Sequence, residues 1–322
     1  MRTRGRLIIA FVLVVVAAVS IYMFMNRGGK DDDGGLKVVT TIFPVYDFAR
    51  AVCADKAKVI MLLTPGLEAH SYEPKPSDIA TLAGASLFIY TSAEMEPWAS
   101  DLISSMGTGS KATALEAGFG VPVLLEAADE EDEHAKGGSV HEDEHAHDPH
   151  IWLDFSNAQY MVRRIAEAMA SLDPDNAEYY RDNAESYCLR LEELDRKFLE
   201  VVSGASTRTI IHGGHYAFGY MSIRYGLKYS AVQGFSPDTE PSPRQMSEMA
   251  EALKKEATGY IFYEELIEPR AAKVIAEETG ASMLMLHAGH NISKEDFEAG
   301  VSFIDIMERT LESLKTGLGY GG

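Results

Sequence analysis

The sequence predicts an α/β protein with two Rossmann-like lobes, each with a parallel sheet, joined by a single long rigid helix. Strand-like segments rich in β-branched and aromatic residues alternate with helical patterns in both halves of the chain. Between the halves, one apolar stripe at helical spacing runs without a break. A Pro-rich segment of the first half, EPKPSDI (73–79), also has a counterpart in the second, EPSPRQM (240–246), which suggests a duplicated lobe.

The first 35 residues are expected to lie outside the folded lobes. Arg2, Arg4 and Arg6 precede an uncharged apolar run (7–25), which a polar, Gly-rich tether follows. At about 1.5 Å per residue in a helix, the run nearly crosses the ~30 Å core of a bilayer. The arginines orient it with the N-terminus inside. We therefore expect an export signal, either cleaved or kept as a membrane anchor, and a folded part outside the cytoplasm.

The first lobe is predicted over residues 36–175. Its strands are LKVVTTIF (36–43), KVIMLL (58–63) and SLFIY (86–90), because each is a short run of apolar, largely β-branched or aromatic residues. Strands that alternate with helices form a parallel sheet covered on both faces. Residues 128–149 are acidic, rich in histidine and without periodicity, and are predicted to form a loop.

The connecting helix is predicted over residues 176–203. Its apolar stripe consists of Tyr180, Ala184, Tyr187, Leu191, Leu194 and Phe198. At about 1.5 Å per residue the helix spans roughly 40 Å, more than one lobe requires. Residues 204–322 then repeat the strand and helix order of the first half, and are predicted to form the second lobe.

Composition excludes one class of partner and favours another. The net charge of −20 argues against nucleic acid, which binds basic surfaces, and attracts cations. The chain has two cysteines, Cys53 and Cys188. An exported protein can form a disulfide, but we favour two separate buried thiols. No cysteine directly follows the apolar run, so no lipid-attachment site is predicted there.

The histidines gather in four places along the chain. They are His70, His134, His141, His145, His147, His150, His212, His215, His287 and His290. Three of these places follow predicted strands, and in open α/β sheets ligands bind at the carboxyl ends of strands. Imidazole nitrogen suits Zn²⁺, and a tetrahedral zinc site needs four donors. Four separate segments each offering a histidine therefore predict a metal site in the cleft between the lobes.

Two other uses of zinc remain open at this point. A zinc-dependent hydrolase keeps one coordination position open and needs a carboxylate base, for which Glu264 or Glu265 would serve. However, the sequence contains no H-E-x-x-H, G-x-S-x-G or phosphate-loop motif. A surface adhesin that uses zinc structurally is the other alternative. We expect a receptor and not an enzyme.

The chain from Leu36 to Leu314 resembles the solute-binding proteins of zinc and manganese ABC importers. The segments that carry the resemblance are TIFPVYDFA, LLTPGLEAHSYEPKPSDI, DPHIWLD, HYAFGYMSIRYGL and GFSPDTEPSP. The resemblance implies two α/β lobes joined by one helix, with a metal ion held at their interface. It also implies delivery of the ion to a membrane permease driven by ATP hydrolysis. We expect the protein to act as a monomer.

The resemblance also assigns metal ligands. His70 is the histidine of GLEAHSYEP, His150 that of DPHIWLD, and His215 the one before YAFGY. The family's fourth ligand, often Asp, follows the strand after EETGA, where MLMLHAGHNIS places His287. His287 is therefore the first choice and His290 the second, ahead of Glu264 and Glu265.

The acidic, His-rich loop favours zinc as the ligand. Family members with such a loop resemble zinc importers, and all-nitrogen donors favour Zn²⁺, whereas carboxylate oxygens suit Mn²⁺. Mn²⁺ is therefore the second choice. The loop histidines are expected to bind ions weakly and raise their concentration near the site: His134, His141, His145 and His147.

Overall fold

The computed structural model describes residues 35–105, 112–124, 147–234, 240–256 and 258–321. The predicted export signal or anchor lies outside these residues, and so does most of the acidic loop. Among the described helices, none combines the length and the apolar character that a membrane span requires.

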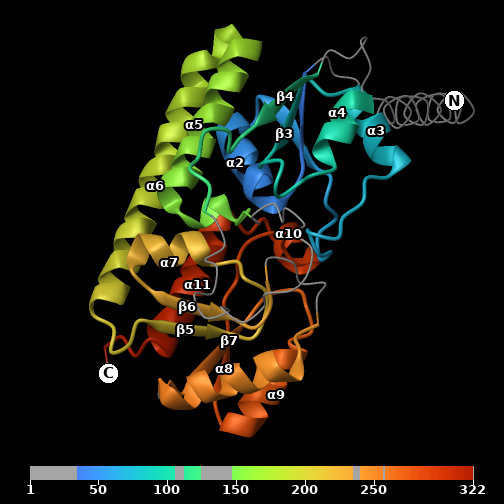
Figure 1. Ribbon diagram of the computed structural model, residues 1–322. Helices are drawn as coiled ribbons and strands as arrows, with labels where there is room; N and C mark the ends of the chain where they lie inside the picture. Colours follow the sequence, from blue (N-terminus) through green and yellow to red (C-terminus); the bar gives the residue numbers. More distant parts are fainter. Residues whose placement is uncertain (1–34, 106–111, 125–146, 235–239, 257, 322) are drawn as a thin grey trace, which may run out of the picture. The chain divides into compact units, whose positions relative to one another are not determined.

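Two four-stranded parallel sheets carry the fold, and their strands follow the same order (Figure 1). The first sheet has the order β2-β1-β3-β4, and the second β6-β5-β7-β8. The strands are β1 (Leu36–Thr40), β2 (Ala57–Met61), β3 (Leu87–Tyr90), β4 (Thr113–Glu116), β5 (Thr209–His212), β6 (Lys228–Ala231), β7 (Tyr260–Tyr263) and β8 (Ser282–Met285). Each sheet with its helices is one lobe. The shared order supports an internal duplication, in which LFIY of β3 corresponds to YIFY of β7.

The first lobe contains α2 (Phe43–Cys53), α3 (Pro76–Ala83), α4 (Ala99–Ser105), the 3₁₀ turn η1 (Ile151–Leu153) and α5 (Phe155–Leu172). Pro44 stands in the first turn of α2, where a backbone N–H has no helical partner to lose. The carboxylate of Asp154 caps α5 by accepting a hydrogen bond from the backbone N of Ser156 at 2.8 Å. This cap fixes the chain just after His150.

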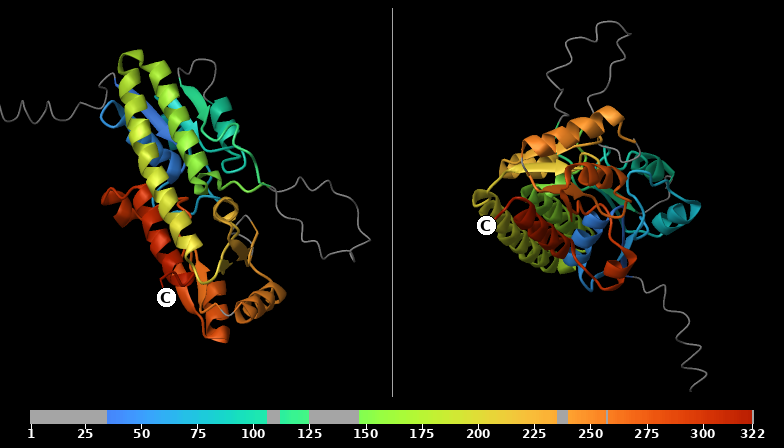
Figure 2. Two further views of the ribbon diagram at one scale, coloured as in Figure 1. Left: turned by 90° about the vertical axis from the view of Figure 1, so that its left-hand side faces the viewer. Right: turned by 90° about the horizontal axis from the view of Figure 1, so that it is seen from below.

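A 27-residue helix, α6 (Ala177–Ser203), follows the turn η2 (Pro174–Asn176). The predicted stripe is buried at every position: Tyr180, Ala184, Tyr187, Leu191, Leu194 and Phe198. Helix α6 packs along α5 and also contacts α2 and α11, so it touches elements of both lobes (Figure 2). The predicted fold class, two parallel-sheet α/β lobes with one long helix, is confirmed.

The second lobe contains α7 (Gly219–Tyr225), α8 (Pro243–Lys255), α9 (Arg270–Thr279), α10 (Lys294–Glu298) and α11 (Phe303–Gly317). The sequence alone predicts a single last helix, capped by Ser293 and running to about Leu314, but the chain forms two helices there. Gly300, at φ +75°, ends the first one, because this left-handed conformation does not continue a helix. Ser302 then caps α11 by accepting from the backbone N of Asp305.

Both cysteines are buried and free, as expected. Burial raises the pKa of the Cys53 thiol to about 12 and that of Cys188 to about 11. The thiolate is the reactive form of cysteine. These side chains therefore contribute packing and not chemistry.

Candidate metal centre

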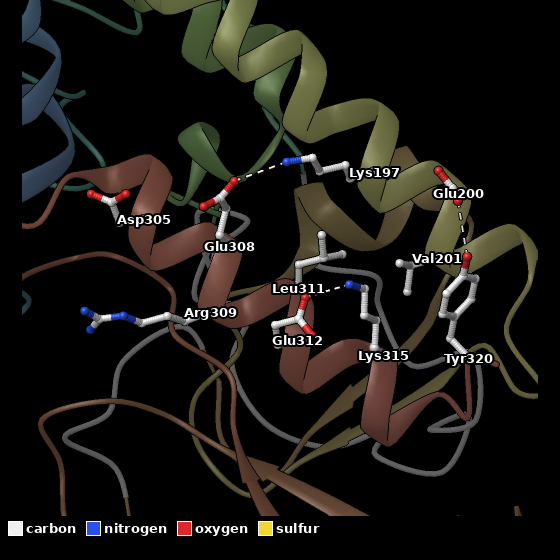
Figure 3. Close-up of a pocket in the computed structure, with 10 residues that line it drawn as sticks. All are labelled: Lys197, Glu200, Val201, Asp305, Glu308, Arg309, Leu311, Glu312, Lys315 and Tyr320. Atoms are coloured by element: carbon white, nitrogen blue, oxygen red, sulfur yellow. Dashed lines mark hydrogen bonds and ion pairs between the residues drawn. The ribbon is translucent and has the colours of Figure 1, made fainter. Parts of the chain in front are cut away.

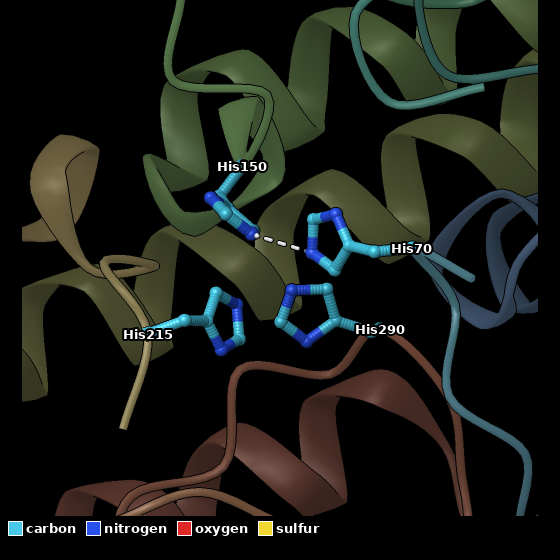
Figure 4. A group of neighbouring side chains, drawn as sticks. All are labelled: His70, His150, His215 and His290. Carbon is cyan, nitrogen blue, oxygen red and sulfur yellow. Dashed lines mark hydrogen bonds between the residues drawn. The ribbon is translucent and has the colours of Figure 1, made fainter. Parts of the chain in front are cut away.

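Four histidines converge on one point (Figure 4). One ring nitrogen from each of His70, His150, His215 and His290 lies within 4.8 Å of the others. His70 follows β2, and His150 directly precedes η1. His215 lies between β5 and α7, and His290 between β8 and α10. Each lobe thus supplies two histidines, and three of the four follow strands of a parallel sheet, where ligands of such sheets bind.

Glycines next to the histidines allow this convergence. A Cβ atom on Gly214 would lie 2.6 Å from the Oε1 atom of Glu264, so only glycine lets that carboxylate approach the segment of His215. Gly289, at φ +79°, turns the chain directly before His290. The motifs HGGH and HAGH therefore encode backbone geometry as well as ligands.

Three buried carboxylates orient three of the rings. The Nδ1 atom of His150 lies 2.7 Å from Oδ1 of Asp148, and that of His290 lies 3.3 Å from Oε1 of Glu265. Nδ1 of His215 is hydrogen-bonded to Glu264. A carboxylate that accepts from Nδ1–H leaves Nε2 unprotonated and able to bind a metal, as in many zinc proteins.

The Nε2 atoms lack ordinary partners. Those of His215 and His290 are buried without a hydrogen-bond partner among the described residues. Those of His150 and His70 lie 3.4 Å apart. Zinc–nitrogen bonds of ~2.0–2.1 Å in a tetrahedron place neighbouring nitrogens roughly 3.3 Å apart. The spacing of this pair therefore fits two ligands of one zinc ion.

The electrostatics favour neutral rings at His70 and His150 and a charged carboxylate at Glu265. Burial, together with repulsion from His290 and His215, lowers the pKa of His70 to about 2. Burial likewise holds the pKa of His150 well below its usual value. Burial alone would raise the pKa of Glu265, but the nearby His287 and His290 outweigh it and hold that pKa well below its usual range. A neutral imidazole is the form that binds a metal.

The choice between the candidates for the fourth position differs from our expectation. The structure brings His290 into the group and leaves His287 outside it. Nδ1 of His287 lies 3.2 Å from Oε1 of Glu265 and accepts a hydrogen bond from the backbone N of Gly289 at 3.0 Å. His287 lines a separate pocket, which Met285 and α10 also line. The physical reason is the turn at Gly289, which directs His290 toward the other rings.

The remaining predicted residues lie around the group. Glu264 and Glu265 contact His215 and His290 through Nδ1 and are not members of the group. Among the loop histidines, His134, His141 and His145 lie outside the described residues. His147 is exposed, with its Nδ1 atom 3.8 Å from Oε1 of Glu94. The accessory role of the loop stays a prediction.

Sequence reasoning missed Asp148. This residue is buried, and its Oδ1 atom accepts from both the backbone N and Nδ1 of His150. Burial raises the pKa of Asp148 to about 7, against the lowering effect of the bond from the His150 backbone. The signal was an Asp two residues before a candidate ligand, in DPH.

A surface pocket of about 680 Å³ lies between α6 and α11 (Figure 3). Four of its charged side chains pair with one another: Lys197 with Glu308 at 3.2 Å, and Lys315 with Glu312 at 2.6 Å. None of the four clustered histidines lines it. Its polar groups are satisfied without a ligand.

Two parallel-sheet lobes with a converging group of four buried or half-buried histidines define a two-lobed metal-binding protein. Residues 38–317 match the family of the zinc-uptake complex component A, periplasmic (ZnuA), and the chain belongs to this family. The family is one of periplasmic substrate-binding receptors and not a known class of enzyme.

Individual relatives agree with this assignment. The chain is 36% identical over 315 residues to the high-affinity zinc uptake system protein ZnuA of Bacillus subtilis, covering 98% of this chain and 97% of the relative. It is 32% identical over 303 residues to the zinc-binding lipoprotein AdcA of Streptococcus pneumoniae, covering 94% of this chain but 60% of that longer protein. The Zn(II)-bound ZnuA-like domain of S. pneumoniae AdcA superposes with a TM-score of 0.73 at 32% identity, covering 88% of this chain and 99% of the domain.

Proposed function

We propose that this protein captures Zn²⁺ outside the cytoplasm and delivers it to the permease of an ABC importer. The four Nε2 atoms of His70, His150, His215 and His290 would hold the ion. The observation that carries the proposal is this convergence of four buried or half-buried rings, three of them oriented by carboxylates. Membership of the zinc-uptake family supports the cargo and the permease.

The charge balance of the site suits a divalent cation. Four neutral imidazoles contribute no charge, so the positive charge of the ion is balanced by the carboxylates behind the rings. Glu264 and Glu265 have pKa values held below their usual range by the histidines, despite the opposing effect of burial.

His70 is the least buried of the four rings. The ion therefore enters from the side of His70.

Zinc is preferred over manganese for a chemical reason. A set of four nitrogens suits zinc, whereas Mn²⁺ favours carboxylate and water oxygens. The nearby carboxylates are already bound to ring Nδ1 atoms. We expect Mn²⁺ to bind more weakly than Zn²⁺, which competition between the two ions at the same protein concentration would measure.

The same geometry argues for a receptor over a hydrolase. A catalytic zinc needs an open position for water, but four protein ligands complete a tetrahedron. Glu264, a potential base, is occupied by His215. We also infer that the protein works as a monomer, and that residues 1–35 export it or anchor it to the membrane.

Elemental analysis of protein purified without added metal tests the proposal directly. We expect one zinc per chain in the unmodified protein and none retained after dialysis in a His150→Ala variant. Zinc uptake by cells should also depend on the protein, and uptake should be restored by the unmodified protein but not by the variant. Equal zinc content in both proteins would show that the ion is held elsewhere.

A further inference from the structure

A short segment of the second lobe, residues 288–292, is hydrogen-bonded to the first lobe on both sides of His290. The backbone N of Phe43, in the first turn of α2, donates to the carbonyl of His290 at 3.1 Å. The backbone N of Gly66 donates to the carbonyl of Ile292 at 2.8 Å. The second lobe supplies His290, but these hydrogen bonds fix the backbone around it to the first lobe.

The side chain of Asn291 strengthens this link. Its Nδ2 atom donates to the carbonyls of Thr64 and Leu67, at 2.8 and 2.7 Å. Its Oδ1 atom accepts from the backbone N of Ile292 at 2.8 Å. Thr64 and Leu67 belong to the loop between β2 and α3 that carries His70. The buried amide of Asn291 thus connects the segment of His290 to the loop that carries His70.

The turn of His150 is tied to the same segment. Trp152, two residues after His150, is fully buried, and its Nε1 atom donates to the carbonyl of Ala288 at 2.8 Å. The rings of Trp152 and His290 are in edge contact, with centroids 5.5 Å apart. Residues 288–292 therefore connect three of the four histidine-bearing segments.

The segment of His215 is held differently. The backbone N of Gly213 donates to Phe262 at 2.8 Å, and that of Tyr216 donates to Gly234 at 2.8 Å. The hydroxyl of Tyr229 donates to the carbonyl of His215 at 3.2 Å. These partners belong to the second lobe and not to residues 288–292.

We propose that Asn291 is a positioning residue that locks the loops of His70 and His290 together. His70, His150 and His290 then form one preorganised unit, to which His215 is added from a separate segment. This inference rests on the proposed binding of zinc by these histidines. Asn291 does not touch the ion, and acts through the placement of the rings.

The expected size of the effect follows from how metal sites respond to their supporting residues. Without the amide, the carbonyls of Thr64 and Leu67 lose their donor, and of the bonds described above only that from Gly66 to Ile292 still ties the loop of His70 to this segment. Loss of outer partners typically lowers metal affinity by about 10- to 100-fold. We expect an effect of this size for Asn291→Ala, and a smaller one for Asn291→Ser, whose hydroxyl keeps one donor.

The control is an asparagine with a similar bond far from the rings. Nδ2 of Asn183, on α6, donates to the carbonyl of Val52 on α2 at 3.1 Å. Zinc affinity of the full chain would be measured by competition with a chromophoric chelator, and folding by thermal unfolding without zinc. Unchanged affinity in both Asn291 variants would overturn the inference, and so would an equal loss in Asn183→Ala. An unmodified protein that bound no zinc would instead refute the proposed function.

A double-mutant cycle separates positioning from a general loss of stability. Asn291→Ala should lower zinc affinity less in a His70→Ala background, because the loop it locks then carries no ligand. In a His215→Ala background it should lower affinity by the same factor as in the unmodified chain. Equal factors in the two backgrounds would show that Asn291 does not couple the loops.

Discussion

The histidine centre and the pocket between α6 and α11 both contain ionisable side chains. Four of those in the pocket pair with one another, whereas two ring nitrogens of the centre have no hydrogen-bond partner in the part of the chain that the structure describes. In the pocket, Lys197 and Glu308 pair with each other and remain 41% and 50% exposed. In the centre, the Nε2 atoms of His215 and His290 are buried without a partner among the described residues. A buried polar atom without a partner costs about 1–3 kcal/mol. Unmet buried polarity on rings that converge on one point, and not pocket volume, therefore marks the place that needs a ligand.

The largest expected effect comes from removing one ring of the centre. Binding free energies of about 10–16 kcal/mol shared by four ligands imply a loss of roughly 3 kcal/mol per ligand, on the order of 100- to 1,000-fold in affinity. His150→Ala should show this loss in a chelator competition assay. Glu308→Ala, in the pocket, should leave zinc affinity unchanged. Similar losses in both variants would remove the distinction between the two regions.

A comparable loss should distinguish the two histidines that follow β8. His290 belongs to the group and His287 does not. We expect His290→Ala to weaken zinc binding on the order of 100- to 1,000-fold. His287→Ala should weaken it far less, because His287 contacts the site through Glu265 and the backbone N of Gly289 and is not one of the clustered rings. The reverse order, measured by the same competition, would make His287 the ligand.

An intermediate effect is expected from a carboxylate behind the rings. Glu265 accepts from the backbone N of Ala288 and of Gly289, and also contacts Nδ1 of His290. Glu265→Gln keeps the shape but removes the charge, and should lower zinc affinity by about 10- to 100-fold. The matched pocket variant, Glu312→Gln, should have no effect on zinc. A neutral outcome for Glu265→Gln would mean that the charge behind His290 does not support binding.

Much of the fold could be predicted from the sequence, because its signals are local. The β-branched strands and the stripe of α6 are periodic patterns that depend on neighbouring residues. Strand β4, with the sequence TALE, was missed because its residues are exposed or half-buried and carry no strong apolar pattern. The division between α10 and α11 was missed because one glycine interrupts an otherwise helical sequence.

The candidate site was only partly predictable, for a geometric reason. His70, His150 and His215 were selected by motif, and the structure brings them together. His287 and His290 follow the same strand three residues apart, so sequence position alone does not decide between them. The left-handed turn at Gly289 decides, and glycine suits it because φ is +79° and because a Cβ atom there would lie 3.1 Å from the ring of Phe303. Asp148 was missed because it lies at the end of the segment predicted as an acidic loop (128–149), among other carboxylates.

A smaller effect should come from His212, a buried histidine outside the group. Burial lowers its pKa to about 4, against the raising effect of Glu264. The unfolded chain takes up a proton on His212 near pH ~6.5, whereas the folded chain does so near the lower pKa. The free energy of unfolding therefore keeps its full value above pH ~6.5 and decreases as the pH falls toward the pKa of the folded state. Between about pH 6 and pH 5, the zinc-free protein should lose about 1.2 kcal/mol more than a His212→Gln variant. Urea unfolding at the two pH values measures the difference, and equal slopes would contradict it.

The smallest effect is expected in the pocket itself. The pair of Lys197 and Glu308 joins α6 to α11, but both side chains are substantially exposed. Exposed ion pairs contribute about 0–1 kcal/mol, because water and salt screen them. Lys197→Ala should therefore lower the free energy of unfolding by less than about 1 kcal/mol, as measured in urea, and leave zinc affinity unchanged. A loss of about 3–5 kcal/mol, the size expected for breaking a buried pair, would show that these charges hold the helices together. The charges of the pocket would then hold the connecting helix against the second lobe. The pocket would differ from the histidine centre in its role and not in the strength of its interactions.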